Sequence, residues 1–341
     1  MQVYHLIPDQ GLDGLVLRHA DTPRPGPGQV LVRMRAASLN YRDLRVAEGR
    51  YALGSVPENL VPLSDGAGEV ISIGSGVSRV QPGDRVAALF LQHWLGGDFE
   101  EAFGVSALGG SCHGVLAEYA VFDQNGLVKL PSHLSFEEGA TLPCAGTTAW
   151  NALFGATPVK PGETVLTLGT GGVSLFALQF AKMAGARVIA TSSSAAKLNN
   201  ALQLGADEGI DYTTSPDWHE QVMALTRGRG VDHVIEVVGG ENVGKSVEAT
   251  RNGGTVHLIG AQAGGLIDPT RVRRRNVTMR GLYVGSRAHF ESMNLAIAQH
   301  ALKPVIDSVF PFTEAKAAYH HLASRTHMGK VVITLGGQAT A

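Results

Sequence analysis

The sequence predicts a two-domain α/β protein, with a β-rich first region followed by a doubly wound parallel sheet. Three observations support this. Short period-2 apolar segments separated by glycine and proline fill roughly the first 125 residues. From about Pro131, helical and strand patterns alternate, which is typical of a parallel sheet covered by helices. A glycine-rich turn at 169–174 joins an apolar strand to an amphipathic helix, and 341 residues suit two domains.

The first region is expected to form short antiparallel strands. Between residues 30 and 36, Val30, Val32 and Met34 alternate with side chains of the opposite face, the signature of a half-buried strand. Similar segments predict strands at 68–74, 85–90 and 117–121. The segment 91–114 is glycine-rich and aromatic, and its length favours a loop or lid over a site.

The second region is expected to alternate helices with buried strands. Helices are predicted at 195–204, 217–226 and 243–251, and strands at 187–191, 209–212, 233–238, 255–260 and 277–284. This alternation predicts a parallel sheet with helices on both faces. A helix at 313–323 and a strand at 330–334 follow, and we expect both to return to the first domain.

The glycine turn carries a dinucleotide fingerprint, Gly169-Thr-Gly171-Gly-Val-Ser174, with serine in place of the usual third glycine. Gly169 permits the tight turn, and Gly171 lets the backbone approach a pyrophosphate. The helix after the turn directs its free N–H groups toward the phosphates. The strand at 187–191 completes a βαβ unit, so we predict nucleotide binding, with a plain structural turn as the alternative.

The end of the strand at 187–191 indicates which nicotinamide cofactor binds. An Asp or Glu about 20 residues beyond the first glycine contacts the ribose in NAD-selective folds. Here the strand leads into Ser192, Ser193 and Ser194, followed by Lys197, and no carboxylate repels a 2′-phosphate. We therefore predict NADPH rather than NADH. In the alternative, the serines cap the next helix and Lys197 is solvated, and both can hold together.

Composition excludes several classes of protein. A formal net charge of −2 gives no reason to expect nucleic acid, and the basic run Arg271–Arg275 is expected to be a solvated surface. The chain has no apolar stretch of about 18 residues and no signal-peptide pattern. Two cysteines cannot form a disulfide framework. We expect a cytoplasmic protein with no membrane partner.

Several motifs occur in a characteristic order, at 38–43, 62–70, 82–86, 143–150, the glycine turn and 329–332. Together they resemble the medium-chain dehydrogenase/reductase superfamily over nearly the whole chain, and within it the zinc-independent quinone oxidoreductase-like branch. The resemblance implies a GroES-like catalytic domain at 1–130 and 301–341, and a Rossmann domain at 131–300. It also implies a homodimer, which could pair through the strand at 277–284.

The zinc ligands of the superfamily's zinc members are not matched. The resemblance aligns their positions with Asn40, with Ser64-Asp65 and with Cys144. An amide is a poor zinc ligand, and one thiolate does not hold the ion. The structural zinc lobe of those members would need four close cysteines, and the corresponding loop of this chain holds Cys112 alone. We predict that no metal is bound.

The resemblance also implies catalytic residues, namely Asn40, Arg45 and Tyr51. Tyr51 could donate a proton or hydrogen bond, Arg45 could stabilise an oxyanion, and Asn40 could orient substrate or cofactor. In the alternative, Tyr51 only packs and Asp43 only ties down its own loop.

The remaining implied residues form two sets. Those that contact the cofactor are Asn40, Thr148, Gly169, Thr170, Gly171, Gly172, Val173, Ser192, Ser193, Lys197, Tyr212, Val238, Gly239, Ile259, Gly260, Ala261, Leu282, Tyr283 and Lys330. Those that line the substrate pocket are Tyr41, Phe90, Trp94 and Cys144, with ordinary core packing as the alternative.

The expected function is that of a metal-free, NADPH-dependent oxidoreductase acting in the interdomain cleft. Without a Lewis acid, hydrogen-bond donors must stabilise charge on the acceptor oxygen. That favours a small carbonyl compound, quinone or α,β-unsaturated carbonyl compound. The alternatives are an alcohol dehydrogenase, an enoyl-thioester reductase and, from another class, a non-catalytic NADPH-binding protein.

Overall fold

The computed structural model describes residues 1–7, 10–51, 53–260 and 264–336. The chain divides into two compact units, residues 1–147 with 284–341, and residues 148–283. The segments 131–147 and 284–300, which the sequence pattern assigns to the nucleotide-binding domain, lie in the first unit. There α2 (Phe136–Ala140) packs on β3 (Gln29–Ser38), and α9 (Arg287–His300) packs on β7 (Leu127–Lys129).

The first unit is built on a seven-stranded sheet, and the predicted strands of the first region are all present. The sheet order is β14 (Ile306–Pro311), β15 (Lys330–Thr334), β3, β4 (Asp65–Ile73), β5 (Arg85–Ala88) and β7, with β6 (Tyr119–Asp123) pairing β3. β1 (Gln2–Leu6) and β2 (Leu15–His19) form a separate ribbon. β15 pairs antiparallel with β3, so the predicted return of the tail is confirmed.

Among the described residues, four α-helices lie wholly in the first unit. They are α1 (Tyr41–Ala47), α2, α9 and α10 (Ala315–Ser324). Only α10 is predicted by periodicity. At the start of α1 the Asn40 N–H donates to Asp43 Oδ2 at 2.7 Å, so Asp43 does tie down its own loop.

The segment 91–114 is a loop with one short 3-10 helix, η2 (Glu101–Ser106). Its aromatic rings pack on each other, with the Trp94 centroid 5.4 Å from Phe99 and 6.3 Å from Phe103. The Trp94 indole N–H donates to Gly97 O at 3.1 Å. The loop is confirmed, and its role as a lid stays a prediction.

The second unit contains a six-stranded, wholly parallel sheet, as predicted. Its order is β10 (Glu208–Asp211), β9 (Arg187–Ser192), β8 (Thr164–Thr167), β11 (Val231–Glu236), β12 (Thr250–Leu258) and β13 (Thr278–Gly281). The chain moves outward from β8 to β10 and then restarts beside β8 with β11. Such a switch point is where open α/β sheets bind ligands.

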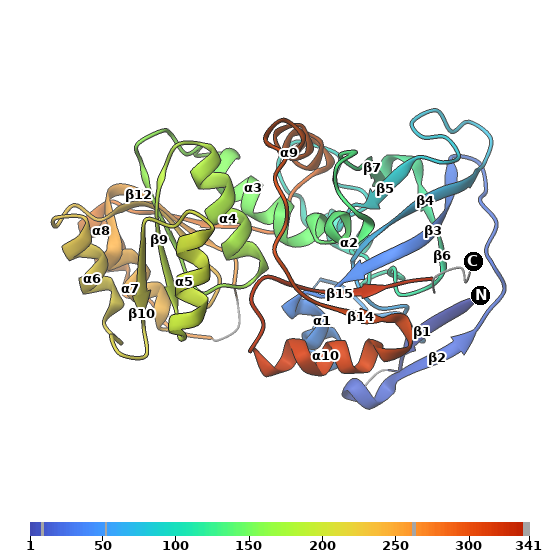
Figure 1. Cartoon of the computed structure of the whole chain (residues 1–341), viewed down its shortest axis with the longest axis horizontal. Coiled ribbons are helices and arrows are strands. Elements are labelled where there is room, and N and C mark those ends of the chain that lie inside the picture. Colours follow the sequence, from blue (N-terminus) through green and yellow to red (C-terminus); the bar gives the residue numbers. More distant parts are fainter. Residues whose placement is uncertain (8–9, 52, 261–263, 337–341) are drawn as a thin grey trace. The chain divides into compact units, whose positions relative to one another are not determined.

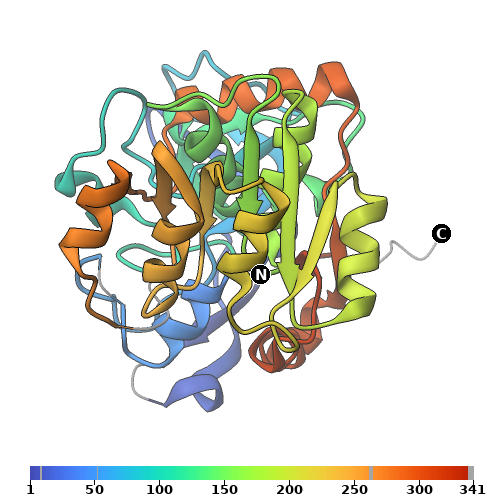
Figure 2. The same ribbon diagram turned by 90° about the vertical axis from the view of Figure 1, so that its left-hand side faces the viewer.

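Helices cover both faces of this sheet, so the doubly wound arrangement is confirmed. Figure 1 shows α4 (Gly172–Met183) and α5 (Ala195–Gln203) on one side, with α6 (Trp218–Leu225), α7 (Asn242–Ala249) and α8 (Pro269–Arg275) on the other. Figure 2 looks onto the strands of the same unit. α3 (Thr147–Phe154) precedes the first of these strands.

The second unit contains the strand predicted to form a homodimer and the basic run predicted to be a solvated surface. β13 lies at the sheet edge and is shorter than the predicted strand, and the homodimer stays a prediction. In α8, Arg271 pairs with Glu248 at 2.8 Å and Arg275 donates to Thr250 O. No helix in the described residues is long and apolar enough to cross a membrane.

A buried chain of hydrogen bonds crosses one face of the parallel sheet. His233 Nε2 lies 3.1 Å from Glu163 Oε2, and His233 Nδ1 lies 3.1 Å from His257 Nε2. Because a carboxylate only accepts, His233 carries its proton on Nε2 and accepts at Nδ1 from His257. His257 Nδ1 is then a buried acceptor with no hydrogen-bond partner among the described residues. Burial lowers the pKa of both imidazoles, which favours their neutral forms.

We expect His257→Gln to reduce the acid sensitivity of the protein. Burial, His233 and Arg280 lower the pKa of His257 from 6.5 to about 3. The unfolded chain therefore takes up this proton first, and stability is lost as the pH falls from about 6.5 to about 3. Glutamine cannot titrate, but its amide can still donate to His233. Thermal unfolding midpoints measured from pH 4 to 7.5 should fall less steeply in the variant.

The control is His300→Gln, at the exposed end of α9, which should keep the wild-type slope. Equal slopes for His257→Gln and the wild type would show that burial of His257 does not govern acid sensitivity.

Candidate functional site

The first candidate site lies in the first unit and is built around a buried lysine. Lys330, on β15, is 3 % exposed, and its Nζ donates to Leu39 O at 2.6 Å and to Asn40 Oδ1 at 2.5 Å. The same Nζ lies 3.9 Å from Asp65 Oδ2. We call Asn40, Asp65, Cys144 and Lys330 the Lys330 cluster.

The carboxylate of this cluster is bound on several sides. Asp65 accepts from the Ser64 hydroxyl at 2.7 Å and from the Cys144 backbone N–H at 3.1 Å. Burial raises the pKa of Asp65, and the Lys330 charge opposes that effect. Burial, with the charge of Asp65, raises the pKa of the Cys144 thiol far above its usual range. Cys144 is therefore a neutral thiol.

These residues do not fit a zinc ion. The positions matched to zinc ligands present an amide, a hydroxyl beside a carboxylate, and a thiol that resists deprotonation. An ammonium group already bonds to Asn40 and pairs with Asp65. Among the described residues, no group of three or more His, Cys, Asp and Glu side chains is arranged to hold a metal.

The predicted catalytic arginine is not the one that meets Tyr51. Arg45 lies on the outer side of α1 and pairs with Glu48 at 3.5 Å, with a third of its side chain exposed. Arg42, three residues earlier, has 16 % of its side chain exposed, and its guanidinium lies 4.7 Å from the Tyr51 ring centroid. The sequence alone did not separate them, because either arginine of so short a helix could face inward.

Three of the four predicted pocket residues come together. Phe90 and Trp94 belong to one apolar cluster, against which Tyr51 and Cys144 pack. Tyr41 packs instead on the main core of the first unit, and the Arg325 guanidinium lies 5.7 Å from its ring centroid. Tyr41 is thus separate from the other three.

The glycine turn has the backbone that its sequence predicts. Gly169 has φ +73°, and its N–H donates to the Thr191 hydroxyl at 3.2 Å. A side chain on Gly171, the N-cap of α4, would meet open space, which leaves room for a ligand beside the backbone. Ser174, at the third glycine position, donates to Leu168 O at 2.7 Å and so ties α4 to β8. Thr170, Gly172 and Val173 complete the turn and open the helix.

The predicted adenosine end gathers at the carboxyl ends of β9 and β10. Ser192 is buried and Ser193 exposed, and the Tyr212 N–H donates to Ser192 O at 3.1 Å. Ser194 caps α5 by accepting from the Lys197 N–H at 3.4 Å, as the capping alternative expects. No carboxylate lies between residues 192 and 197.

A glutamate that the sequence did not point to holds the turn after β11. Glu236 is fully buried, and its Oε1 accepts from the N–H groups of Val238 and Gly239 at 2.8 and 2.9 Å. The N–H groups of Ile259 and Gly260 donate to Glu236 O. In the sequence, the signal for this role would have been a glutamate near the end of an otherwise apolar strand pattern.

The other predicted cofactor residues lie on several different elements. Thr148 is buried in α3, Leu282 is buried after β13, and Tyr283 is half exposed. Ala261 lies outside the described residues. Lys330 belongs to the first unit, where its ammonium group bonds internally.

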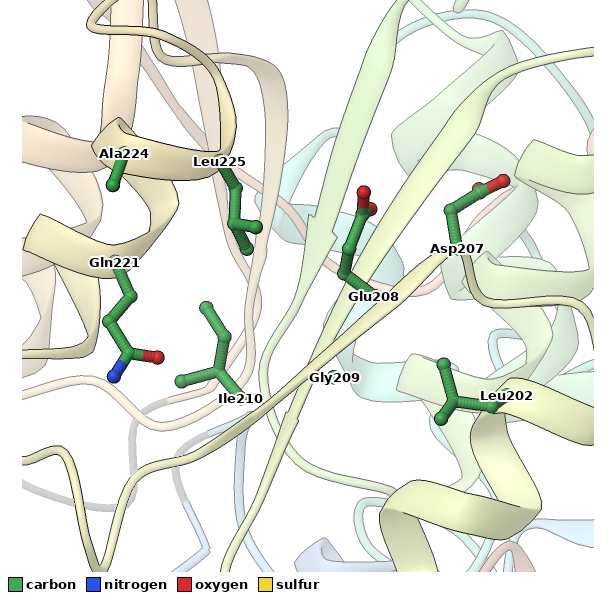
Figure 3. A pocket seen from close by; sticks show the side chains of 8 residues that line it. All are labelled: Leu202, Asp207, Glu208, Gly209, Ile210, Gln221, Ala224 and Leu225. Atoms are coloured by element: carbon green, nitrogen blue, oxygen red, sulfur yellow. The ribbon is translucent and has the colours of Figure 1, made fainter.

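One hollow of the second unit does not coincide with the predicted cofactor site. It has a volume of about 420 Å³ and lies beside the edge strand β10 (Figure 3). The acidic side chains of Asp207 and Glu208 at its rim pair with Lys182 and Arg187. Residues of the glycine turn do not line it.

Comparison with known proteins identifies the family to which the chain belongs. Residues 26–132 match the alcohol dehydrogenase GroES-like domain, and residues 172–299 match the zinc-binding dehydrogenase family. A zinc-type alcohol dehydrogenase-like protein of Schizosaccharomyces pombe is 42 % identical over 98 % of this chain and 100 % of the relative. The chain belongs to the medium-chain dehydrogenase/reductase superfamily of oxidoreductases. A quinone oxidoreductase of Sus scrofa is 29 % identical over 92 % of this chain and 91 % of its own.

Solved structures agree with this assignment. A putative alcohol dehydrogenase from Sinorhizobium meliloti has a TM-score of 0.91 at 39 % identity, covering 98 % of this chain and 99 % of its own. An NAD-dependent alcohol dehydrogenase has a TM-score of 0.90 at 34 % identity, covering 98 % and 100 %. A mycobacterial protein in complex with NADPH has a TM-score of 0.82 at 27 % identity, covering 98 % and 100 %.

Proposed function

We propose that the chain is a zinc-independent, NADPH-dependent reductase of a small carbonyl compound, quinone or α,β-unsaturated carbonyl compound. The Lys330 cluster carries this proposal. Where zinc members of the superfamily place ligands, this chain has an amide and a carboxylate bound to an internal ammonium group. N–H and O–H donors must then stabilise negative charge on the substrate oxygen, which suits conjugated acceptors best.

The second unit would hold the cofactor. The backbone around Gly171 and the N-terminus of α4 would bind the pyrophosphate. Ser193 and Lys197 would bind the adenosine 2′-phosphate, where no carboxylate repels it. Bound NADPH supplies the hydride. One similar structure contains NADPH and another is named as NAD-dependent, so the relatives do not favour either cofactor. The proposal of NADPH is therefore based on the hydroxyl-rich end of β9.

The first unit would supply the donors. Tyr51 is suited to this role because its hydroxyl is buried and makes no well-aligned hydrogen bond to a described residue. Asn40 Nδ2 is likewise buried and makes no well-aligned hydrogen bond to a described residue, while the Oδ1 of the same amide accepts from Lys330. Arg45 has no role in the proposal, because it pairs with Glu48 at the surface.

The test uses the full chain and follows NADPH absorbance at 340 nm with quinones, enones, aldehydes, ketones and enoyl thioesters. Alcohols are assayed with NADP⁺. We expect turnover of conjugated acceptors that survives chelation, with far less than one zinc per chain by elemental analysis. Stoichiometric zinc, with activity lost on chelation and restored by re-metallation, would overturn zinc independence. Turnover of alcohols or thioesters alone would select those alternatives, and tight NADPH binding without any turnover would select the non-catalytic one.

A further inference from the structure

Arg42 occupies an unusual environment in the first unit. It is the second residue of α1, and its guanidinium contacts two aromatic rings. The Tyr51 centroid is 4.7 Å from the guanidinium carbon, and the Phe90 centroid is 4.9 Å from it. A planar cation over an aromatic ring is attracted to the ring face, and two such contacts restrict where it can lie.

The same guanidinium ties down the turn that follows η2. Arg42 Nη1 donates to Leu108 O at 2.9 Å and to Gly109 O at 3.0 Å, and lies 3.3 Å from Asp43 Oδ1. A Cβ atom on Gly110 would overlap both Arg42 Nη2 and the Tyr51 ring. The Tyr51 ring therefore packs tightly against α1 and the turn 108–110.

Arg42 is not placed to bind a substrate oxygen itself. Its Nε and Nη2 are buried and make no well-aligned hydrogen bond to a described residue. Gly110 lies so close to Nη2 that a Cβ atom on it would overlap that nitrogen. Any effect of Arg42 on the reaction is then exerted through a neighbour, and Tyr51 is the neighbour that the proposed function uses as a donor.

We propose that Arg42 is a positioning residue that holds the Tyr51 phenol in place and supports its action as a donor. The inference rests on the proposed function in one respect, namely that Tyr51 serves the reaction. Arg42 stabilises the phenolate that remains when Tyr51 gives up its proton.

The electrostatics agree with this geometry. Burial raises the pKa of Tyr51, and the Arg42 charge opposes that rise. The Ser111 hydroxyl also lowers the pKa of Tyr51, whereas Cys112 raises it. Around Arg42 itself, the charged neighbour is Asp43, and the titratable neighbours besides Tyr51 are Cys112, Cys144 and Tyr319. Removal of the guanidinium should therefore move the phenol titration to higher pH.

The test compares Arg42→Met, Arg42→Lys, Tyr51→Phe and the double variant Arg42→Met/Tyr51→Phe with the wild type. We expect Arg42→Met to lower kcat roughly 10- to 100-fold, the range of a weakened acid, with little change in KM. The double variant should be no slower than Tyr51→Phe, because the two residues act as one unit.

The titration of Tyr51 is followed by absorbance at 295 nm in alkaline solution, with the Tyr51→Phe curve subtracted. Its midpoint should shift to higher pH in Arg42→Met and much less in Arg42→Lys. Arg50→Met, an exposed arginine nearby, is the control for loss of a charge.

Gly110→Ala provides a second test if Arg42→Met does not fold. It displaces the guanidinium from the ring without altering either group, and should lower kcat at least 10-fold. A folded Gly110→Ala with wild-type kcat would overturn the inference. The inference would also be overturned if the kinetic losses multiply in the double variant and the Tyr51 titration of Arg42→Met stays at the wild-type pH. Full activity in Tyr51→Phe would instead refute the role of Tyr51 in the proposed function.

Discussion

Lys330→Met is expected to lower the free energy of unfolding by about 3–5 kcal/mol at pH 8, the cost of leaving a buried charge without its partner. The Lys330 ammonium donates to Leu39 O and Asn40 Oδ1 and lies 3.9 Å from Asp65. Methionine fills a similar volume but leaves the Asp65 carboxylate with neutral donors only. The loss should shrink as the pH falls, because a group with a raised folded pKa gains relative stability once protonated. Urea denaturation at several pH values measures both effects.

Two further variants serve as controls for Lys330→Met. Lys330→Met/Asp65→Asn removes both charges and should recover most of the lost stability. Lys316→Met removes an exposed lysine whose partner, Asp13, is almost fully exposed, and should change stability by no more than about 0.5 kcal/mol. A Lys330→Met loss below about 1 kcal/mol at every pH would show that the ammonium group does not hold the cluster together.

Ser193→Asp is expected to raise the KM for NADPH about 100-fold, or ~2.7 kcal/mol, with a far smaller effect on NADH. Ser193 is exposed at the end of β9, between buried Ser192 and the helix cap Ser194. A carboxylate there would face the doubly charged 2′-phosphate, and like charges at close range repel strongly. The same carboxylate could accept hydrogen bonds from the unphosphorylated ribose.

Initial rates with each cofactor at a fixed acceptor concentration measure this switch. Ser193→Asn is the matched control, since it has the size of aspartate without the charge and should retain the preference for NADPH. If Ser193→Asp leaves the KM for NADPH unchanged, the 2′-phosphate does not bind at this strand end, and the preference for NADPH must be sought elsewhere.

Much of the second unit could be predicted because its signals are local. Gly169 needs a positive φ and no side chain, and both requirements are visible in the residue type. Apolar periodicity likewise predicted the parallel strands and the helices between them. It placed the last strand at 277–284, whereas β13 spans only Thr278–Gly281, because β12 pairs with it over that stretch alone.

The predicted boundaries of the nucleotide-binding domain depend on a different kind of information. The sequence analysis predicts neither α2 nor α9, and local periodicity would not show against which sheet a helix packs. The structure places both with the first unit, where α2 contacts β3 and α9 contacts β7. α1 is only seven residues long, too short for a periodic signal.

By itself, the sequence determined the fold class and the nucleotide fingerprint, since each follows from residue type and local spacing. The resemblance to the superfamily added that an amide and a hydroxyl stand at positions where its zinc members have ligands. Only the tertiary structure decided which cation meets those residues. Lys330 and Asn40 are 290 residues apart, and pairing of β15 with β3 brings them together. It also decided that Arg42 rather than Arg45 meets Tyr51, because contacts between distant segments depend on how whole elements pack and not on the composition of any one of them.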